Sequence, residues 1–165
     1  MKSGNRYLAR IYRTTGEKEP SAAIAAFVRK KRTASEPLDL LAIRLGVTRI
    51  SEESLAFEGG VFKLPSGELV IKLKTDSPPS RKQFTLAHEI GHLMLGEPGL
   101  RSSCGGDRDL ERTCDAIAGE LLMPAEDATM FVQSLGQPSP EKLKIIASKY
   151  GVSVHAAAVR VQSGR

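Results

Sequence analysis

The sequence has 165 residues, of which 41% are hydrophobic and 26% charged, and its formal net charge is +5. These values are typical of a globular chain with one compact domain, so they exclude a fibrous or wholly disordered protein. No apolar run approaches the ~20 residues that a membrane-spanning helix needs, and the basic N-terminus lacks the apolar segment of a signal peptide. We therefore expect a protein of the cytoplasm that has no contact with a membrane.

The first 35 residues are expected to form a basic, helical lead to the main domain. Residues 20–32 are rich in alanine, begin at Pro20 and end in the cationic run Arg29–Arg32. Cations suit the last turn of a helix, so a helix is predicted here. The same run could bind nucleic acid, but we favour the solvated end of a helix.

The remainder, residues 36–165, is expected to form an α+β domain. A helix at 36–45 and a β-hairpin at 61–74 precede a series of helices, which are predicted at 81–95, 109–123, 125–134, 140–149 and 154–162. Because the helices do not alternate with strands, the pattern favours an α+β fold in which a small antiparallel sheet is followed by helices. Residues 140–162 are expected to pack as an αα-hairpin.

The motif His88-Glu89-Ile90-Gly91-His92 lies within the predicted helix 81–95. Two histidines four residues apart differ by about 40° around a helix and by about 6 Å along it, so both rings can reach one cation. Neutral imidazole suits Zn²⁺, and Glu89 can accept a proton from a water that the metal activates. The motif therefore predicts a zinc-dependent peptidase.

A catalytic zinc usually takes three protein ligands, so a third must come from elsewhere. One candidate is His155, and others are acids of the helix 109–123. Glu111 and Asp115 share one side of that helix and Glu120 lies opposite, so only one of the two glutamates can face the metal. We favour Glu111 as the ligand and Asp115 as the acceptor that orients a zinc histidine. Acids on an exposed helix face are the alternative.

The chain resembles the ImmA/IrrE family of metallopeptidases in three stretches, which are residues 83–92 (QFTLAHEIGH), residues 111–115 (ERTCD) and residues 120–124 (ELLMP). The resemblance covers roughly residues 38–160. It implies a small zincin-like fold, zinc ligands at His88, His92 and Glu111, and Glu89 as the catalytic base. Where the family often has Asn, this chain has Asp115, which keeps an acceptor and adds a charge.

The resemblance also implies a protein substrate. Several members of the family cleave or inactivate a helix-turn-helix repressor, so a cytoplasmic repressor of this type is the expected substrate of an endopeptidase. In zincins an extended peptide can pair with an edge strand above the metal, and residues 68–74 are the expected strand.

Two other functions remain as alternatives. Residues 143–160 resemble a helix-turn-helix pattern that residues 38–54 echo, which would suit a DNA-binding module. The second helix of that pattern offers His155 and Arg160 among mostly apolar residues, so nucleic acid is not an expected partner. The other alternative is a regulatory or anti-repressor domain that binds zinc without cleaving a substrate.

A few further residues are candidates for roles near the metal. His155 is the first candidate for a side chain that stabilises the oxyanion, and the tyrosines Tyr7, Tyr12 and Tyr150 follow it. Cys104 and Cys114 are expected to be free thiols. Cys104 lies in the loop between the two ligand-bearing helices, from which its thiolate could approach the metal.

Overall fold

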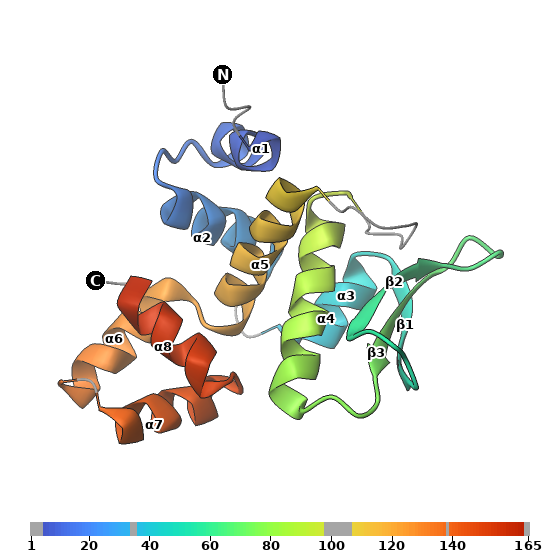
Figure 1. Cartoon of the computed structure of the whole chain (residues 1–165). Coiled ribbons are helices and arrows are strands. Elements are labelled where there is room, and N and C mark those ends of the chain that lie inside the picture. Colours follow the sequence, from blue (N-terminus) through green and yellow to red (C-terminus); the bar gives the residue numbers. More distant parts are fainter. Residues whose placement is uncertain (1–4, 34–35, 98–106, 138, 164–165) are drawn as a thin grey trace.

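The computed structural model describes residues 5–33, 36–97, 107–137 and 139–163 (Figure 1). In chain order the elements are α1 (Arg6–Thr15), α2 (Pro20–Lys31), α3 (Leu38–Arg44), β1 (Val47–Glu53), β2 (Gly59–Lys63), β3 (Leu69–Lys74), α4 (Pro79–Met94), α5 (Arg108–Leu122), α6 (Ala125–Leu135), α7 (Pro140–Tyr150) and α8 (Val154–Ser163). The α+β class is confirmed. In these ranges no helix is long and apolar enough to cross a membrane.

The helix boundaries follow local signals in the sequence. Helix α4 begins at Pro79, where a missing N–H costs nothing, and its last turn precedes Gly96, whose φ of +66° suits glycine. Helix α7 begins after Ser139, whose hydroxyl accepts a hydrogen bond from the N–H of Lys142, and ends at Gly151. The predicted helices from residue 81 onward are therefore confirmed, and so are the helices predicted at 20–32 and 36–45.

The sheet differs from the prediction in two respects. Its strand order is β1-β3-β2, with β1 parallel and β2 antiparallel to β3, so the sheet is mixed rather than antiparallel. The hairpin of β2 and β3 is confirmed, but residues 68–74 do not form an edge, because β3 is paired on both sides. The expectation that this strand receives a substrate is therefore wrong. The third strand, β1, lies within residues 38–54, so the weak likeness of these residues to a helix-turn-helix pattern is also wrong.

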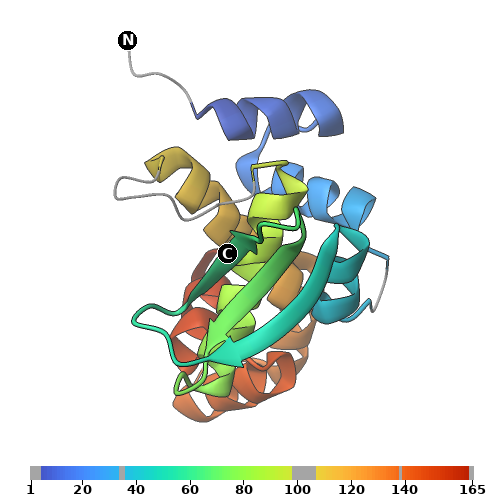
Figure 2. The ribbon, with the colours of Figure 1, turned by 90° about the vertical axis from the view of Figure 1, so that its right-hand side faces the viewer.

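The core lies between the sheet and the helices that cover one of its faces. Val61 of β2 and Ile71 of β3 are fully buried and belong to one cluster with Ile90 of α4 and Ile117 of α5. Figure 1 shows α4 between the sheet and α5, and Figure 2 shows the sheet in front of α4. This arrangement places α4 next to both β2 and α5, whose residues complete the site.

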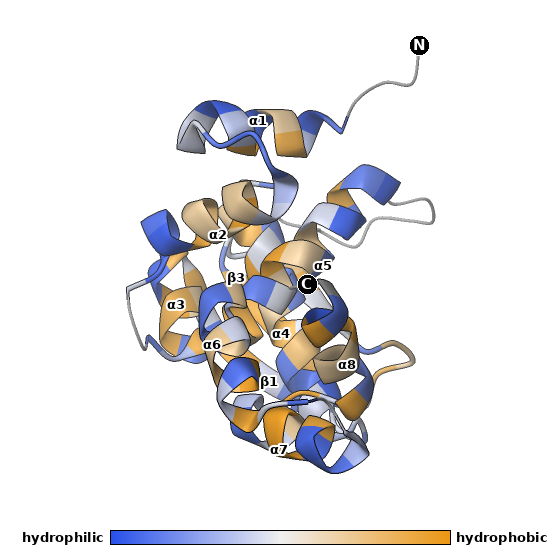
Figure 3. Cartoon of the chain, turned by 90° about the vertical axis from the view of Figure 1, so that its left-hand side faces the viewer, coloured by the Kyte–Doolittle hydropathy of each residue, from blue (hydrophilic) through white to orange (hydrophobic). Residues whose placement is uncertain are grey.

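The N-terminal helices share this core. Tyr7 and Ile11 of α1 and Phe27 of α2 are buried in it, and α1 carries both hydrophilic and hydrophobic residues (Figure 3). Two cations of the run Arg29–Arg32 donate to the carbonyl oxygens at the ends of neighbouring helices. Lys30 donates to Thr14 of α1 and Arg32 to Leu121 of α5, which agrees with a role at helix ends.

The C-terminal helices form a second, smaller cluster. Helices α7 and α8 pack together as expected of an αα-hairpin, with α6 beside them. Their buried residues include Ala128, Ile146 and Ala157, one from each helix. Arg160 of α8 donates to the main-chain carbonyl of Met123 and pairs with the buried Glu120 of α5, which ties this cluster to the helix that carries Glu111.

Candidate metal centre

Helix α4 presents two histidines one turn apart on the side that faces α5. The side chain of His92 is only 5% exposed and that of His88 16% exposed. Their Nε2 atoms lie 3.2 Å from each other. The four-residue spacing of the motif therefore brings both rings to one point, as expected.

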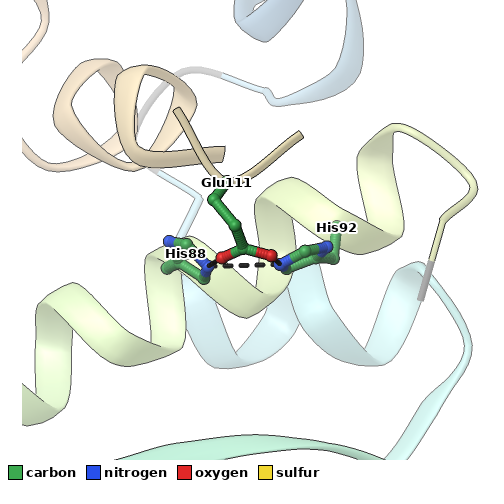
Figure 4. A group of neighbouring side chains, drawn as sticks. All are labelled: His88, His92 and Glu111. Carbon is green, nitrogen blue, oxygen red and sulfur yellow. Dashed lines mark hydrogen bonds and ion pairs between the residues drawn. The ribbon is translucent and has the colours of Figure 1, made fainter. Parts of the chain in front are cut away.

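Glu111, in the first turn of α5, completes a triangle of ligand atoms (Figure 4). Its Oε2 lies 3.1 Å from Nε2 of His88, and its Oε1 lies 3.6 Å from Nε2 of His92. A tetrahedral zinc with bonds of about 2.0–2.1 Å holds its ligand atoms about 3.3–3.4 Å apart. The distances between these side chains therefore fit a zinc ion.

The hydrogen-bond partner of each Nδ1 atom shows which nitrogen of that histidine ring carries the proton. Nδ1 of His92 lies 3.2 Å from the main-chain oxygen of Glu97, which can only accept, so Nδ1 carries the proton. Nδ1 of His88 lies 2.9 Å from Oδ1 of Asp115, which accepts in the same way. In the neutral rings both Nε2 lone pairs then point toward Glu111. Three acceptors that converge without a proton between them suit a cation.

Glu89 lies beside this triangle. It is buried, with a relative exposure of 7%, and its Oε2 accepts a hydrogen bond of 3.1 Å from the N–H of Val61 in β2. Glu58 bonds to Lys74 of β3 and Leu64 bonds to Glu68, just before β3, through their main chains. The alternate residues between them, among them Val61, therefore turn their main-chain groups away from β3. Strand β2 is thus the edge of the sheet that meets the motif.

The carboxylates around the rings shift the pKa values of the histidines in opposite directions. Burial lowers the pKa of His88, but the hydrogen bond to Asp115 and the charges of Glu89, Asp115 and Glu111 together raise it above the usual value. Burial is also the largest influence on His92, and the neighbouring His88 adds to it, so the pKa of His92 is lowered. Above the raised pKa of His88 both rings are neutral, which is the form that binds a metal.

The close approach of α4 and α5 depends on Gly91. A Cβ at this position would lie 3.2 Å from the Cα of Cys114 and 3.3 Å from its carbonyl oxygen. Cys114 is buried there as a free thiol, and burial, followed by the charge of Glu111, raises its pKa. Cys114 is therefore a packing residue in this contact, and the glycine lets α5 bring Glu111 within reach of the histidines.

Other candidate residues lie apart from the triangle. His155 is exposed in the first turn of α8 and is not among the three side chains whose ligand atoms converge in the described ranges. Glu120 faces away from the metal position and pairs with Arg160, as its angle around the helix indicated. The hydroxyl of Tyr150 is buried in the C-terminal cluster, and Cys104 lies outside the described residues. A role for His155 as ligand or oxyanion stabiliser therefore stays a prediction.

Two main-chain contacts of the site could not be found from the sequence. These are the oxygen of Glu97, which orients His92, and the N–H of Val61, which contacts Glu89. A main-chain group has no residue type of its own, so only the fold reveals it.

The comparisons with known proteins agree with this site. The family model Peptidase_M78, described as the IrrE N-terminal-like domain, matches residues 40–162. The radiation response metalloproteases IrrE of Deinococcus deserti and Deinococcus radiodurans are 38% and 33% identical in alignments of 96 residues that cover 53% of this chain. The match covers 34% and 29% of those two proteins, so the chain spans about a third of the length of these curated relatives.

A solved structure has a similar fold. A transcriptional regulator of Mycobacterium tuberculosis superposes with a TM-score of 0.56 at 12% identity, covering 93% of this chain and 50% of that one. Because the family model matches most of the chain, including the three candidate ligand positions, this protein belongs to the ImmA/IrrE family of metallopeptidases.

Proposed function

We propose that this protein is a zinc-dependent endopeptidase that hydrolyses a peptide bond in a cytoplasmic protein. The observation that carries the proposal is the triangle of Nε2 and carboxylate atoms from His88, His92 and Glu111, with the buried carboxylate of Glu89 beside it. The two rings carry their protons on Nδ1, so the ligand atoms are ready for a cation without rearrangement.

The residues around the triangle would divide the chemistry among them. When bound, zinc would act as a Lewis acid and would lower the pKa of a water molecule toward neutral pH. Glu89 would accept a proton from the attacking water and pass it to the nitrogen that leaves when the carbon–nitrogen bond breaks. The N–H of Val61 donates to one carboxylate oxygen of Glu89 and so orients this side chain.

Strand β2 is the edge that a substrate would meet. Gly59 and Lys63 alternate with Val61, so their main-chain N–H and C=O groups also point away from β3. An extended peptide could pair with these groups and lie beside Glu89. Main-chain pairing of this kind needs chain on both sides of the cleaved bond, which favours an endopeptidase.

The family resemblance suggests a helix-turn-helix repressor of the cytoplasm as the substrate. DNA itself is a poor candidate for a partner, because Arg160 is used in the contacts with Glu120 and Met123. Two cations of the run Arg29–Arg32 also donate to main-chain oxygens within the molecule.

The change Glu89→Gln separates a peptidase from a domain that only binds zinc. The variant should keep its zinc, because Glu89 is not a ligand, but should lose cleavage. We would incubate wild type and variant with a proteome-derived peptide library and with helix-turn-helix repressors of the source organism, and identify new termini by mass spectrometry. Glu126→Gln, which removes an exposed carboxylate of α6, is the matched control.

The proposal predicts new termini from wild type and Glu126→Gln and none from Glu89→Gln. If zinc-loaded wild type produces no new termini in the library, the protein is not an endopeptidase. Cleavage of library peptides without cleavage of the repressor would reject only the substrate.

A further inference from the structure

The N-terminal helix α1 lies at the end of the molecule where α4 finishes and α5 begins (Figures 1 and 2). It precedes the stretch that matches the family model. Three of its side chains and its N-cap residue reach the two ligand-bearing helices, at Leu95, at Asp107 and in the first turns of α5. We propose that α1 is part of the metal centre, with Asn5 as a positioning residue that holds Glu111 in place.

Asn5 uses both ends of its amide group. Its Oδ1 accepts from the N–H groups of Tyr7 and Leu8 and so caps α1. Its Nδ2 donates to the main-chain oxygen of Asp109 at 3.2 Å and to Oγ1 of Thr113 at 3.0 Å, both in α5. One side chain therefore begins α1 and binds α1 to the helix that carries the third ligand.

The contact with α5 is made on the side opposite Glu111. Asp109 and Thr113 each lie two residues from Glu111, which is about 200° around a helix. Thr113 is buried, with 2% exposure, and its hydroxyl donates to the oxygen of Asp109. Asn5 therefore supports the first turns of α5 from behind, while Glu111 reaches forward to the histidines.

The support matters because Glu111 stands in the first turn of its helix, where helices fray most readily. The N-cap residue of α5, Asp107, also contacts α1. Asp107 accepts from the N–H of Asp109, and its other oxygen lies 3.3 Å from the hydroxyl of Tyr7 and 3.2 Å from the guanidinium of Arg6. Asp107, Asp109 and Thr113, which lie on both sides of Glu111 in the sequence, are thus bonded to α1 or to its N-cap residue.

The same helix also holds the end of α4. Nη1 of Arg10 donates to the main-chain oxygen of Leu95 at 2.7 Å, three residues after His92. Helix α1 therefore contacts the end of α4 and the beginning of α5. The spacing between α4 and α5 sets the distance between the histidines and Glu111, so we expect zinc affinity to depend on α1.

The inference rests on the proposed zinc site and is tested by zinc affinity rather than by cleavage. In Asn5→Ser the hydroxyl can still cap α1 but cannot reach α5, and in Asn5→Asp the carboxylate caps well but cannot donate. Arg10→Gln removes the contact with α4. Arg13→Gln removes an exposed cation from the same helix and is the matched control. Zinc affinity would be measured by competition with a chromophoric chelator, and the unfolding midpoint would be measured on metal-free protein.

We expect both Asn5 variants to bind zinc more weakly by on the order of tenfold, the size typical of lost contacts behind metal ligands. Arg13→Gln should bind as wild type does. Wild-type affinity in the Asn5 variants, with only the unfolding midpoint lowered, would overturn the inference, since Asn5 would then serve stability alone. If neither Asn5 variant folds, unchanged affinity in Arg10→Gln overturns it equally.

The proposed site can fail separately. Wild type that binds no zinc, or His92→Ala that binds zinc as wild type does, would reject the metal centre itself, and the role of Asn5 with it. Zinc binding that His92→Ala abolishes and the α1 variants leave unchanged would reject only the role of α1.

Discussion

A single negative charge, that of Asp115, acts on the metal centre through the Nδ1 atom of His88. The carboxylate lies 2.9 Å from this nitrogen and helps to raise the pKa of the ring, against the effect of burial. A charged acceptor behind a ligand also makes the ligand nitrogen more basic, which strengthens its bond to a metal. At the same time it favours the protonated ring, which cannot bind a metal at Nε2.

Asp115→Asn should therefore change zinc binding in a pH-dependent way. The amide oxygen can still accept from Nδ1–H, but without the charge the pKa of His88 should fall. In wild type, protons compete with zinc as the pH drops through this raised pKa, so affinity begins to fall above pH 6.5, the usual histidine value. In the variant the fall should begin at a lower pH.

Zinc titrations from pH 8 to pH 5.5, with a histidine NMR titration of the metal-free protein, measure both quantities. An unchanged pKa of His88 in Asp115→Asn would show that the carboxylate does not control the ring.

Residue spacing was enough to predict most side chains of the site. The i, i+4 relation placed His88 with His92 and Glu111 with Asp115, and the angle around α5 separated Glu120 from them. The contacts of Glu97 and Val61 use main-chain atoms, whose positions depend on the turn after α4 and on the register of β2. Neither is encoded by a residue type that a reader of the sequence could recognise.

At the scale of elements, the contact between α4 and α5 determines whether the ligands meet. Gly91 lies against Cys114 of α5, where a Cβ would stand 3.2 to 3.3 Å from atoms of that residue, closer than an ordinary contact. Another helical glycine, Gly119 of α5, has no heavy atom within 4 Å of the place where its Cβ would stand. The two glycines differ only in their surroundings, so they form a natural pair for a test.

Gly91→Ala should push α5 away from α4, lower stability by about 1–3 kcal/mol through overpacking and weaken zinc binding. Gly119→Ala should instead raise stability by about 0.5–1 kcal/mol, because alanine favours the helix, and leave zinc affinity unchanged. Denaturant unfolding and chelator competition on both variants would check this. Equal zinc affinity in the two variants would show that the glycine contact does not position Glu111.

The elements themselves were predictable to different degrees. Helices α4 and α7 have clear starts at proline and stops at glycine, and both were predicted within two residues. Strand β1 was missed because its sequence, VTRISEE, has few apolar residues, and because a strand is defined by its partner. It pairs in parallel with β3, and strand β2 lies between them in the sequence, so the presence of β1 and the central place of β3 follow from non-local pairing.

At the scale of the whole molecule, two apolar clusters are joined by a buried ion pair. Glu120 of α5 is 5% exposed, and it pairs with Arg160 of α8 and accepts from the N–H of Ala125. Burial raises the pKa of Glu120, while Arg160 opposes the shift. The pair therefore links the helix that carries Glu111 to the C-terminal helices. The sequence placed Glu120 away from the metal, but nothing in the spacing identified its partner 40 residues later.

Removing one member of this pair should destabilise the protein strongly. Arg160→Met leaves the carboxylate of Glu120 buried without its counter-charge, which should cost on the order of 3 kcal/mol. The double variant Glu120→Gln, Arg160→Met should recover part of this loss. Urea unfolding of the wild type, the single variants and the double variant forms a complete cycle. If the loss of unfolding free energy in the double variant equals the sum of the losses in the two single variants, the two side chains do not interact.

The central claim is that His88, His92 and Glu111 hold one zinc ion, and elemental analysis tests it most directly. Purified wild type, Glu89→Gln, His92→Ala and Glu111→Ala would be compared after equilibration with zinc and removal of free metal. The account predicts about one zinc per chain in the wild type and in Glu89→Gln, and a large loss in the two ligand variants. Wild type without zinc, or ligand variants that retain it in full, would contradict the account.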